Sequence, residues 1–179
     1  MTGFRLDKGG LIERRQKINF HFNGQQVTGF KGDTIASALM ASGHMLVGRS
    51  FKYHRPRGIM SAGVEEGGAL FNTGDGAARV PNVKGTVTEI SEGLRVYSQN
   101  VFPSPGFDLG AVNGFIAPFI TAGFYYKTFM GPFANTKFWM LCERFIRRAA
   151  GLGQASREAD PSTYDIANGY CDALVIGSG

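Results

Sequence analysis

The sequence predicts an α+β fold, and three observations at its start predict it. Residues 16–23 place apolar side chains at every second position, which is typical of a half-buried strand. Asn23-Gly24 follows as a strong signal for a hairpin, and residues 25–30 continue as a second strand. Asp33 or Thr34 can then cap a helix. Strand, hairpin, strand and helix in this order open a ubiquitin-like or ferredoxin-like β-grasp domain.

The rest of the chain divides by composition. Later strands of the β-grasp domain are expected at residues 69–72, 85–90 and 94–99, with the last two joined by a turn at Glu92-Gly93. The predicted boundaries are an N-terminal arm at 1–14, the β-grasp domain at 15–100, an aromatic linker with helices at 101–153, and a linker with the start of a dinucleotide-binding domain at 154–179. Within the aromatic linker, residues 135–150 favour a helix because apolar residues recur there at three and four positions.

The end of the sequence is an apolar run that enters a glycine turn. Residues 171–179 indicate a buried strand followed by Gly-x-Gly, the way a Rossmann-type βαβ unit begins, so Gly177 and Gly179 are candidate cofactor-binding residues. An edge strand with a flexible tail explains the same pattern. Because a single strand and turn make no such domain, we expect a truncated Rossmann domain and a piece of a longer polypeptide.

Composition excludes several classes of protein. A hydrophobic content of 43% supports a folded core, and the net charge of +5 gathers in residues 1–60 and 127–150, which suits anionic cofactors or acidic partner surfaces. Two cysteines, Cys142 and Cys171, imply no disulfide framework. Residues 109–126 are uncharged but contain proline and glycine, so we expect them to be buried against protein and the chain to be cytoplasmic, with no membrane partner.

The most informative segment is basic and aromatic. Its candidate contact residues are Arg49, Lys52, Tyr53, His54, Arg55 and Arg57. Such a segment can hold a phosphate or carboxylate, stack nucleic-acid bases, anchor a subunit interface, or form an ordinary solvated strand. Pro56 fixes the backbone between the last two arginines, and arginine is favoured over lysine for bidentate contacts, which favours recognition of an anion or partner.

The same segment carries a resemblance to a known family. Val47-Gly-Arg-Ser-Phe-Lys-Tyr-His-Arg-Pro-Arg-Gly-Ile59 resembles the signature of the N-terminal domain of the alpha subunit of heterotetrameric sarcosine oxidase, with support from residues 32–39, 107–113, 122–130 and 145–153. The resemblance runs in order over nearly the whole chain. It also implies that a Rossmann-type domain begins at Val175-Ile-Gly-Ser-Gly179.

The resemblance implies a function for a whole complex. That complex oxidises sarcosine to glycine, gives hydrogen peroxide, passes a one-carbon unit to tetrahydrofolate, and carries NAD, FAD and FMN, while this piece is structural and interface-forming. Related amine dehydrogenases hold a [2Fe-2S] cluster on cysteines after the Arg-Pro-Arg-Gly-like turn, but residues 59–67 contain no cysteine, so a cluster-less domain with no cofactor of its own is expected.

Two further interpretations complete the picture. Glu65 and Glu66 are neighbours on a loop, where both are normally solvated, so we expect neither to act in acid–base catalysis. The alternative function is a basic β-grasp module that binds RNA or another protein through residues 49–57, although we expect no nucleic-acid partner. A salt-dependent titration with single-stranded RNA distinguishes the two.

Overall fold

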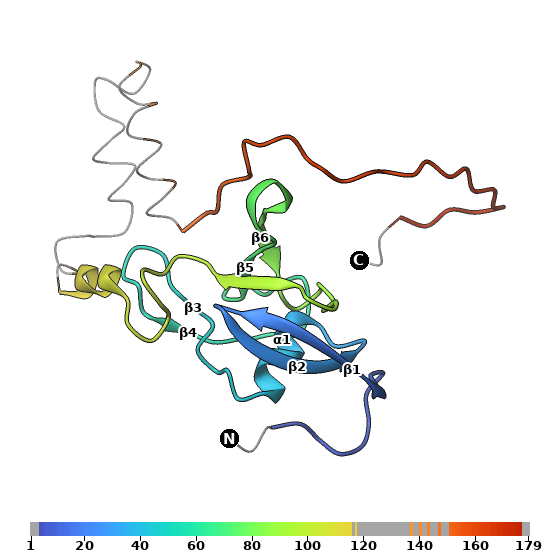
Figure 1. Ribbon diagram of the computed structural model, residues 1–179. Coiled ribbons are helices and arrows are strands. Elements are labelled where there is room, and N and C mark those ends of the chain that lie inside the picture. The colour runs from blue at the N-terminus through green and yellow to red at the C-terminus, as the bar shows by residue number, and fades with distance from the viewer. Residues whose placement is uncertain are drawn as a thin grey trace.

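The structure is a computed structural model that describes residues 4–115, 117, 137, 140, 143, 147 and 151–176. Its centre is a five-stranded mixed sheet with one helix packed against it (Figure 1). The elements are β1 (Glu13–Phe22), β2 (Gln25–Lys31), α1 (Ile35–Ala41), β3 (Gly48–Arg49), β4 (Pro56–Arg57), β5 (Leu70–Thr73), β6 (Val80–Lys84) and β7 (Arg95–Ser98), with short 3-10 helices at Gly76–Ala78 and Leu109–Gly114.

The first hairpin forms as the sequence predicts. β1 and β2 pair antiparallel, and the turn between them contains Asn23 at φ 49° and Gly24 at φ 83°. Two successive residues in the left-handed region make the turn twist with the strands, which is why asparagine and glycine are favoured there. The predicted strands at 16–23 and 25–30 are confirmed, although β1 begins at Glu13.

Helix α1 begins with a capping box. The Thr34 hydroxyl accepts a hydrogen bond from the Ser37 backbone N–H at 3.2 Å, and the Ser37 hydroxyl accepts one from the Thr34 N–H at 3.0 Å. These bonds satisfy two N–H groups that the helix itself leaves without partners. Gly43, at φ 86°, follows the helix end and turns the chain away. The predicted start of the helix is confirmed, with Thr34 as its cap.

The order of strands in the sheet is β2-β1-β7-β5-β6. β1 and β7 run parallel, whereas β5 pairs antiparallel with both β6 and β7. The last strand of the domain therefore lies in the middle of the sheet, beside the first. A mixed sheet of this kind with one packed helix fits the predicted β-grasp fold, and the strands expected at 69–72 and 94–99 are present.

The strand expected at residues 85–90 is wrong. The last strand before β7 is β6, and residues 85–88 instead turn across the start of α1, where the Thr88 carbonyl accepts from the Ile35 N–H and the Gly85 carbonyl accepts from the Ala36 N–H, both at 2.9 Å. Gly85 fits there because a Cβ would lie 2.3 Å from the Phe71 ring. Capping the helix takes the hydrogen bonds that a strand would have used.

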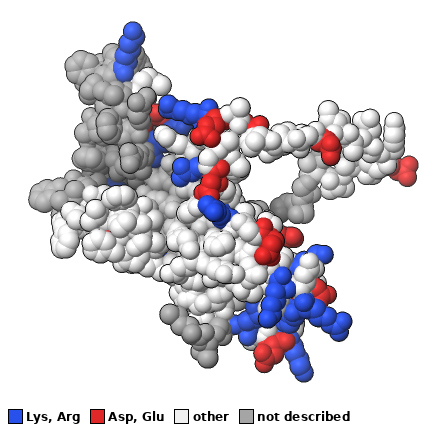
Figure 2. Space-filling model, viewed as in Figure 1, with Lys and Arg blue, Asp and Glu red and all other residues white. Residues whose placement is uncertain are grey.

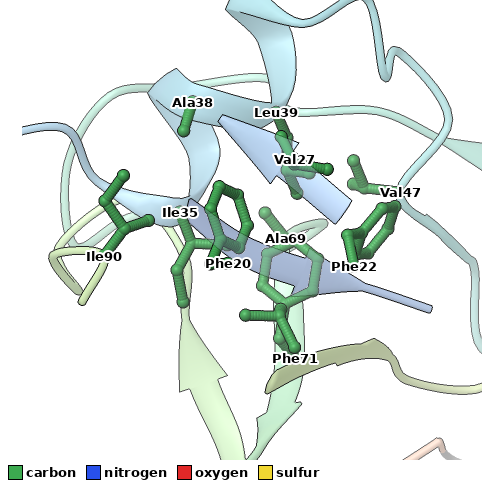
Figure 3. Close-up of a cluster of buried hydrophobic side chains, with 11 residues drawn as sticks. Phe20, Phe22, Val27, Ile35, Ala38, Leu39, Val47, Ala69, Phe71 and Ile90 are labelled. Carbon is green, nitrogen blue, oxygen red and sulfur yellow. The ribbon is translucent and has the colours of Figure 1, made fainter. Parts of the chain in front are cut away.

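The core lies between the sheet and α1. Figure 3 shows the apolar side chains of β1, α1 and β5 pointing toward one another, and Phe20, Phe71, Ile35 and Leu39 are fully buried. The Phe22 and Phe71 rings meet edge to face, with centroids 6.0 Å apart. Burying each such side chain contributes about 1.5–3 kcal/mol, so this cluster supplies the main stabilisation of the domain.

The N-terminal arm is attached to the domain. The Arg5 guanidinium donates to both carboxylate oxygens of the buried Asp33, at 3.1 and 2.6 Å, and the Phe4 N–H donates to the Ala41 carbonyl. Farther along, lysines and arginines gather where β1 begins, including the exposed Arg15 and Lys17 (Figure 2). Much of the positive charge of the first sixty residues therefore lies here.

The chain returns to the domain after the aromatic linker at two glycines. The Gln99 amide donates to the Gly151 carbonyl at 2.7 Å, and the Gly153 N–H donates to the Asn82 side-chain oxygen at 2.9 Å. A Cβ on Gly153 would lie 2.6 Å from Pro81, so only glycine allows this close approach. Beyond this point residues 154–176 extend away from the sheet (Figure 1).

The predicted helix at 135–150 falls largely outside the described residues. The four residues of it that the structure describes, Lys137, Met140, Glu143 and Arg147, are helical, and Arg147 pairs with Glu143 at 2.8 Å. Residues 116–126 of the uncharged stretch expected to be buried also lie outside them, apart from Ala117. The expectation is wrong for the described part of that stretch, where Leu109, Val112 and Phe115 are exposed. Within the described part of the chain, no helix has the length and apolar character needed to cross a bilayer.

Candidate functional site

The basic and aromatic segment forms a small hairpin outside the main sheet. Gly48 pairs with Arg57 and Arg49 pairs with Pro56, and the Ser50 N–H donates to the Arg55 carbonyl at 2.8 Å. The connecting loop is tight, with Lys52 at φ 55° and His54 at φ 50°. The backbone of this hairpin is therefore folded back on itself and does not form the simple solvated strand that one interpretation expected.

Arg49 is half-buried, and its guanidinium contacts the protein backbone. Its guanidinium donates through Nε and Nη2 to the Pro105 carbonyl, at 2.8 and 2.5 Å, and through Nη1 to the His54 carbonyl at 3.1 Å. The Asn100 side-chain amide fixes the same strand by donating to the Ser50 carbonyl at 2.8 Å. Arg49, predicted as an anion or partner contact, holds the hairpin to the loop at residues 102–108.

His54 is also an internal contact. Its Nδ1 lies 2.6 Å from the Asp108 carboxylate, and only 14% of the His54 side chain and 1% of the Asp108 side chain are exposed. The other Asp108 oxygen accepts from the backbone N–H groups of Phe102 at 3.0 Å and Gly110 at 3.2 Å. Gly110 is required here because a Cβ would lie 2.3 Å from the imidazole.

Asp108 was not predicted from the sequence. The local signal, an aspartate before Leu-Gly-Ala, is that of a residue capping a short helix, and the Asp108 side chain does cap the 3-10 helix through the Gly110 N–H. Nothing near Asp108 in the sequence indicates its pairing with His54. Together they lock the hairpin loop onto the chain that leaves the domain.

The remaining basic residues of the hairpin lie on its outer side. The Arg55 guanidinium and the Lys52 ammonium each lie 5.0 Å from the centre of the Tyr53 ring. Arg55 and Arg57 are exposed on either side of the exposed Pro56. Cation–π contacts fix the position of the ring relative to the charges. The hairpin thus has two inward-facing residues, Arg49 and His54, and an outer group of cations.

A cavity of about 280 Å³ opens beside this hairpin. Its wall includes Arg49, Ser50, Phe51 and Arg57 from the hairpin, together with Met60 and the glycines at 67, 68 and 151. The cavity combines apolar surface with guanidinium groups, so it can accept a side chain or small group that is part apolar and part acidic. It lies between Arg57 and the loop that follows β4.

That loop contains a buried carboxylate. Glu66 is 2% exposed, and its carboxylate accepts hydrogen bonds from the backbone N–H groups of Met60 at 2.6 Å, Ser61 at 2.7 Å and Gly68 at 2.5 Å. Burial raises the pKa of Glu66, but the surrounding N–H groups outweigh this and the pKa lies below its ordinary value. The expectation that both glutamates are solvated is wrong for Glu66 and confirmed for Glu65, which is exposed.

Comparison with known proteins places the chain. It is 54% identical over its whole length to the sarcosine oxidase subunit alpha of Rhizobium meliloti (strain 1021), and the alignment covers 18% of that protein. It is homologous to the N-terminal part of sarcosine oxidase alpha subunits. The resemblance seen in the sequence is therefore confirmed. The alpha subunit of Corynebacterium sp. (strain U-96) is 29% identical over 96% of this chain and 13% of that protein.

Two other comparisons concern the domain. Residues 15–101 match a family described as a 2Fe-2S iron-sulfur cluster binding domain. The L-proline dehydrogenase from P. horikoshii superposes with a TM-score of 0.40 and 16% identity over 51% of this chain and 17% of that one, which is too low a score to support a statement about the fold. The chain thus spans less than a fifth of the alpha subunits that it matches.

The residues present do not fit an iron–sulfur cluster. Residues 15–101 contain no cysteine, whereas such clusters take four thiolate or histidine ligands. The described part of the chain contains no group of three or more histidine, cysteine or acidic side chains that could hold a metal ion. In addition, the Glu66 carboxylate already occupies the N–H groups of the loop after β4.

The predicted cofactor residues at the end of the chain, Gly177 and Gly179, lie outside the described residues. The residues before them, 171–176, form no strand, and Leu174, Val175 and Ile176 are 75%, 85% and 89% exposed. The buried strand expected here is therefore absent from the described residues, because a parallel strand needs neighbours and covering helices that residues 4–115 do not offer it.

Proposed function

We propose that this chain forms the N-terminal part of the alpha subunit of a hetero-oligomeric sarcosine oxidase. The observation that supports the proposal is the 54% identity over the full chain to a protein of that name. The chain covers 18% of that relative, so the activity of the whole complex is carried over as part of the proposal. An interaction module that binds RNA is the alternative, and it is less well supported because the Tyr53 ring already contacts two cations.

The proposed complex oxidises sarcosine to glycine. The N-methyl C–N bond is oxidised by two electrons, oxygen accepts them to give hydrogen peroxide, and tetrahydrofolate takes the one-carbon unit. NAD, FAD and FMN belong to other parts of the complex, and no cofactor or iron–sulfur cluster is assigned to this chain. The test is sarcosine-dependent peroxide release by the purified complex. Release by the complex and none by this chain alone is the expected result, and a complex inert toward sarcosine would contradict the proposal.

The role proposed for this chain is to build an interface. Arg55 and Arg57 are exposed and are spaced by Pro56, and Arg57 lines the cavity beside the hairpin. The hairpin that carries them is fixed from inside by Arg49 and by the His54–Asp108 pair. A rigid display of guanidinium groups suits carboxylates of a neighbouring subunit or a nucleotide phosphate. Neither arginine has a carboxylate partner among the described residues.

The experiment is a charge-matched comparison in the complete complex. Arg55→Ala with Arg57→Ala removes two outer cations, and Arg15→Ala with Lys17→Ala removes two exposed cations from β1. Losing a desolvated charged contact costs about 2–5 kcal/mol of association, so the first pair should weaken assembly or the retention of flavin and NAD. The second pair should change neither. Subunit stoichiometry by light scattering and cofactor content by absorbance give the readout.

Unchanged assembly and cofactor content in the Arg55 and Arg57 variant, with an intact fold, would overturn the interface proposal. A loss of equal size in both variants would also overturn it, because the effect would then follow net charge and not the hairpin. Neither result would touch the assignment of the chain to the sarcosine oxidase complex, which the peroxide assay tests separately.

A further inference from the structure

The loop between β4 and β5 has little regular structure, yet hydrogen bonds fix it to the rest of the domain. Its two ends approach closely, since a Cβ on Gly68 would lie 3.0 Å from the Gly58 carbonyl oxygen. Its middle is attached to the rest of the domain by the Thr86 hydroxyl, which donates to the Gly63 carbonyl at 2.8 Å, and by the Lys84 ammonium, which donates to the Val64 carbonyl at 2.5 Å. We call residues 58–68 the Glu66 loop.

The centre of the Glu66 loop is one carboxylate. Oε2 of Glu66 accepts from Met60 and Ser61, and Oε1 accepts from Gly68, so that backbone N–H groups from both ends of the loop converge on one anion. Among the described residues, no lysine, arginine or histidine forms an ion pair with this carboxylate. Its charge is therefore balanced by oriented backbone dipoles, as in the concave N–H arrangements that bind free anions.

Three backbone N–H groups of the loop hold a carboxylate that belongs to the same loop. A buried charge without a partner is strongly unfavourable, so these hydrogen bonds are required as long as Glu66 stays ionised. The neighbouring Glu65 makes a useful contrast, because it is exposed and its hydrogen bond from the Gly63 N–H is long, at 3.3 Å.

We propose that the Glu66 loop is an anion-binding site whose ligand is the chain's own Glu66 carboxylate, and that this internal anion organises the loop in a domain that has no cysteine to hold a metal centre. The site would take a small carboxylate such as formate if the side chain were removed. The proposal does not depend on the function proposed above.

The test replaces the internal anion with an external one. In Glu66→Ala the three N–H groups lose their acceptor, so we expect the amides of Met60, Ser61 and Gly68 to exchange roughly tenfold faster or more, and the urea midpoint of the chain to fall. Sodium formate should restore both in a saturable manner, and sodium chloride at equal ionic strength should not. Glu65→Ala is the matched control and should behave as the parent chain does in every salt.

Glu66→Gln separates charge from volume. It keeps the size of the side chain, but one of its two terminal groups becomes a donor that faces a backbone N–H, so we expect loss of protection in spite of unchanged packing. Glu66→Gln also provides the test if Glu66→Ala does not fold. In the parent chain, the pKa of Glu66 is lower in the folded state than its ordinary value of 4.5. The ionised side chain therefore stabilises the fold fully above about pH 4.5, and this stabilisation is lost as the pH falls through the pKa of the folded state.

The proposal is overturned by three results. One is parental amide exchange in both Glu66 variants, which would mean that the carboxylate does not organise the loop. Another is recovery in chloride equal to that in formate, which would reflect salt and not occupation of a site. The third is an equal loss in Glu65→Ala, which would make the effect one of general charge.

Discussion

His54 and Asp108 show that residues far apart in the sequence act as one unit in the hairpin. They are separated by 54 positions, and the Asp108 carboxylate that contacts His54 also accepts hydrogen bonds from the backbone N–H groups of Phe102 and Gly110. One side chain thus fixes the loop of the hairpin, the following turn and the start of a 3-10 helix. The imidazole, which the sequence placed among outward-facing cations, belongs to this internal network.

Replacing Asp108 tests this network. Asp108→Ala leaves two backbone N–H groups and the His54 ring without an acceptor, so we expect a loss of about 1–3 kcal/mol in the free energy of unfolding, measured with urea. Asp108→Asn keeps one oxygen as acceptor and should lose less. Asp7→Ala, at an exposed residue of the arm, should have no measurable effect. Equal stabilities of the Asp108→Ala and parent chains would show that the network contributes nothing.

At this scale the sequence indicates the spacing of neighbouring residues better than it indicates their hydrogen-bond partners. Pro56 between two arginines indicated a fixed spacing, and both arginines are exposed in that arrangement. Glu66 was misjudged because its burial depends on loop amides that only folding brings together. In the same way, the carbonyl that accepts from Arg49 lies 56 positions away in the sequence. Residue type and spacing carry no record of such partners.

Among the elements, α1 depends on its first turn. Thr34→Ala removes the capping acceptor for the Ser37 N–H and should cost about 1 kcal/mol in the free energy of unfolding. Thr34→Ser keeps the hydroxyl and should stay close to the parent chain. Urea denaturation followed by circular dichroism gives both values. If the serine variant were as unstable as the alanine variant, the methyl group of Thr34 and not the cap would account for the loss.

The elements that were predicted well have local signals. The first hairpin and α1 are encoded by alternation, by Asn23-Gly24 and by the cap at Thr34, all within a few residues. β6 was missed because Pro81 and Asn82 look like strand breakers, and Asn82 indeed adopts φ 59°. Residues 85–90 alternate as a strand does, but their backbone groups cap α1, which only the tertiary fold brings near.

The segment at 170–176 should be loosely packed. Its apolar residues are exposed and make no strand, so we expect amide exchange there to be fast in a monomer of this chain. Strong protection of Leu174 to Ile176 in a monomer would contradict this. Protection from amide exchange that appears only as the protein concentration rises would indicate that this exposed apolar segment pairs edge to edge with another copy.

The whole chain should assemble no iron–sulfur cluster. Its two cysteines are Cys142 and Cys171, both outside the matched domain, and they are too few for the four ligands of a cluster. Anaerobic reconstitution with iron and sulfide should therefore leave the protein colourless, with iron well below one cluster per chain after desalting. Stoichiometric iron and sulfide with a visible absorption band would refute the expectation.

The chain leaves and re-enters the domain at fixed points. It leaves past Asp108, which is bound to His54, and returns at Gly151 and Gly153, which Gln99 and Asn82 hold. Both ends of the connecting stretch are therefore attached to the same domain. The entropic cost of closing such a loop rises by only about 0.6 kcal/mol for each doubling of its length. We therefore expect a change in the length of the sequence between these two attachments to cost the β-grasp domain little stability, which urea denaturation of a shortened or lengthened variant would measure.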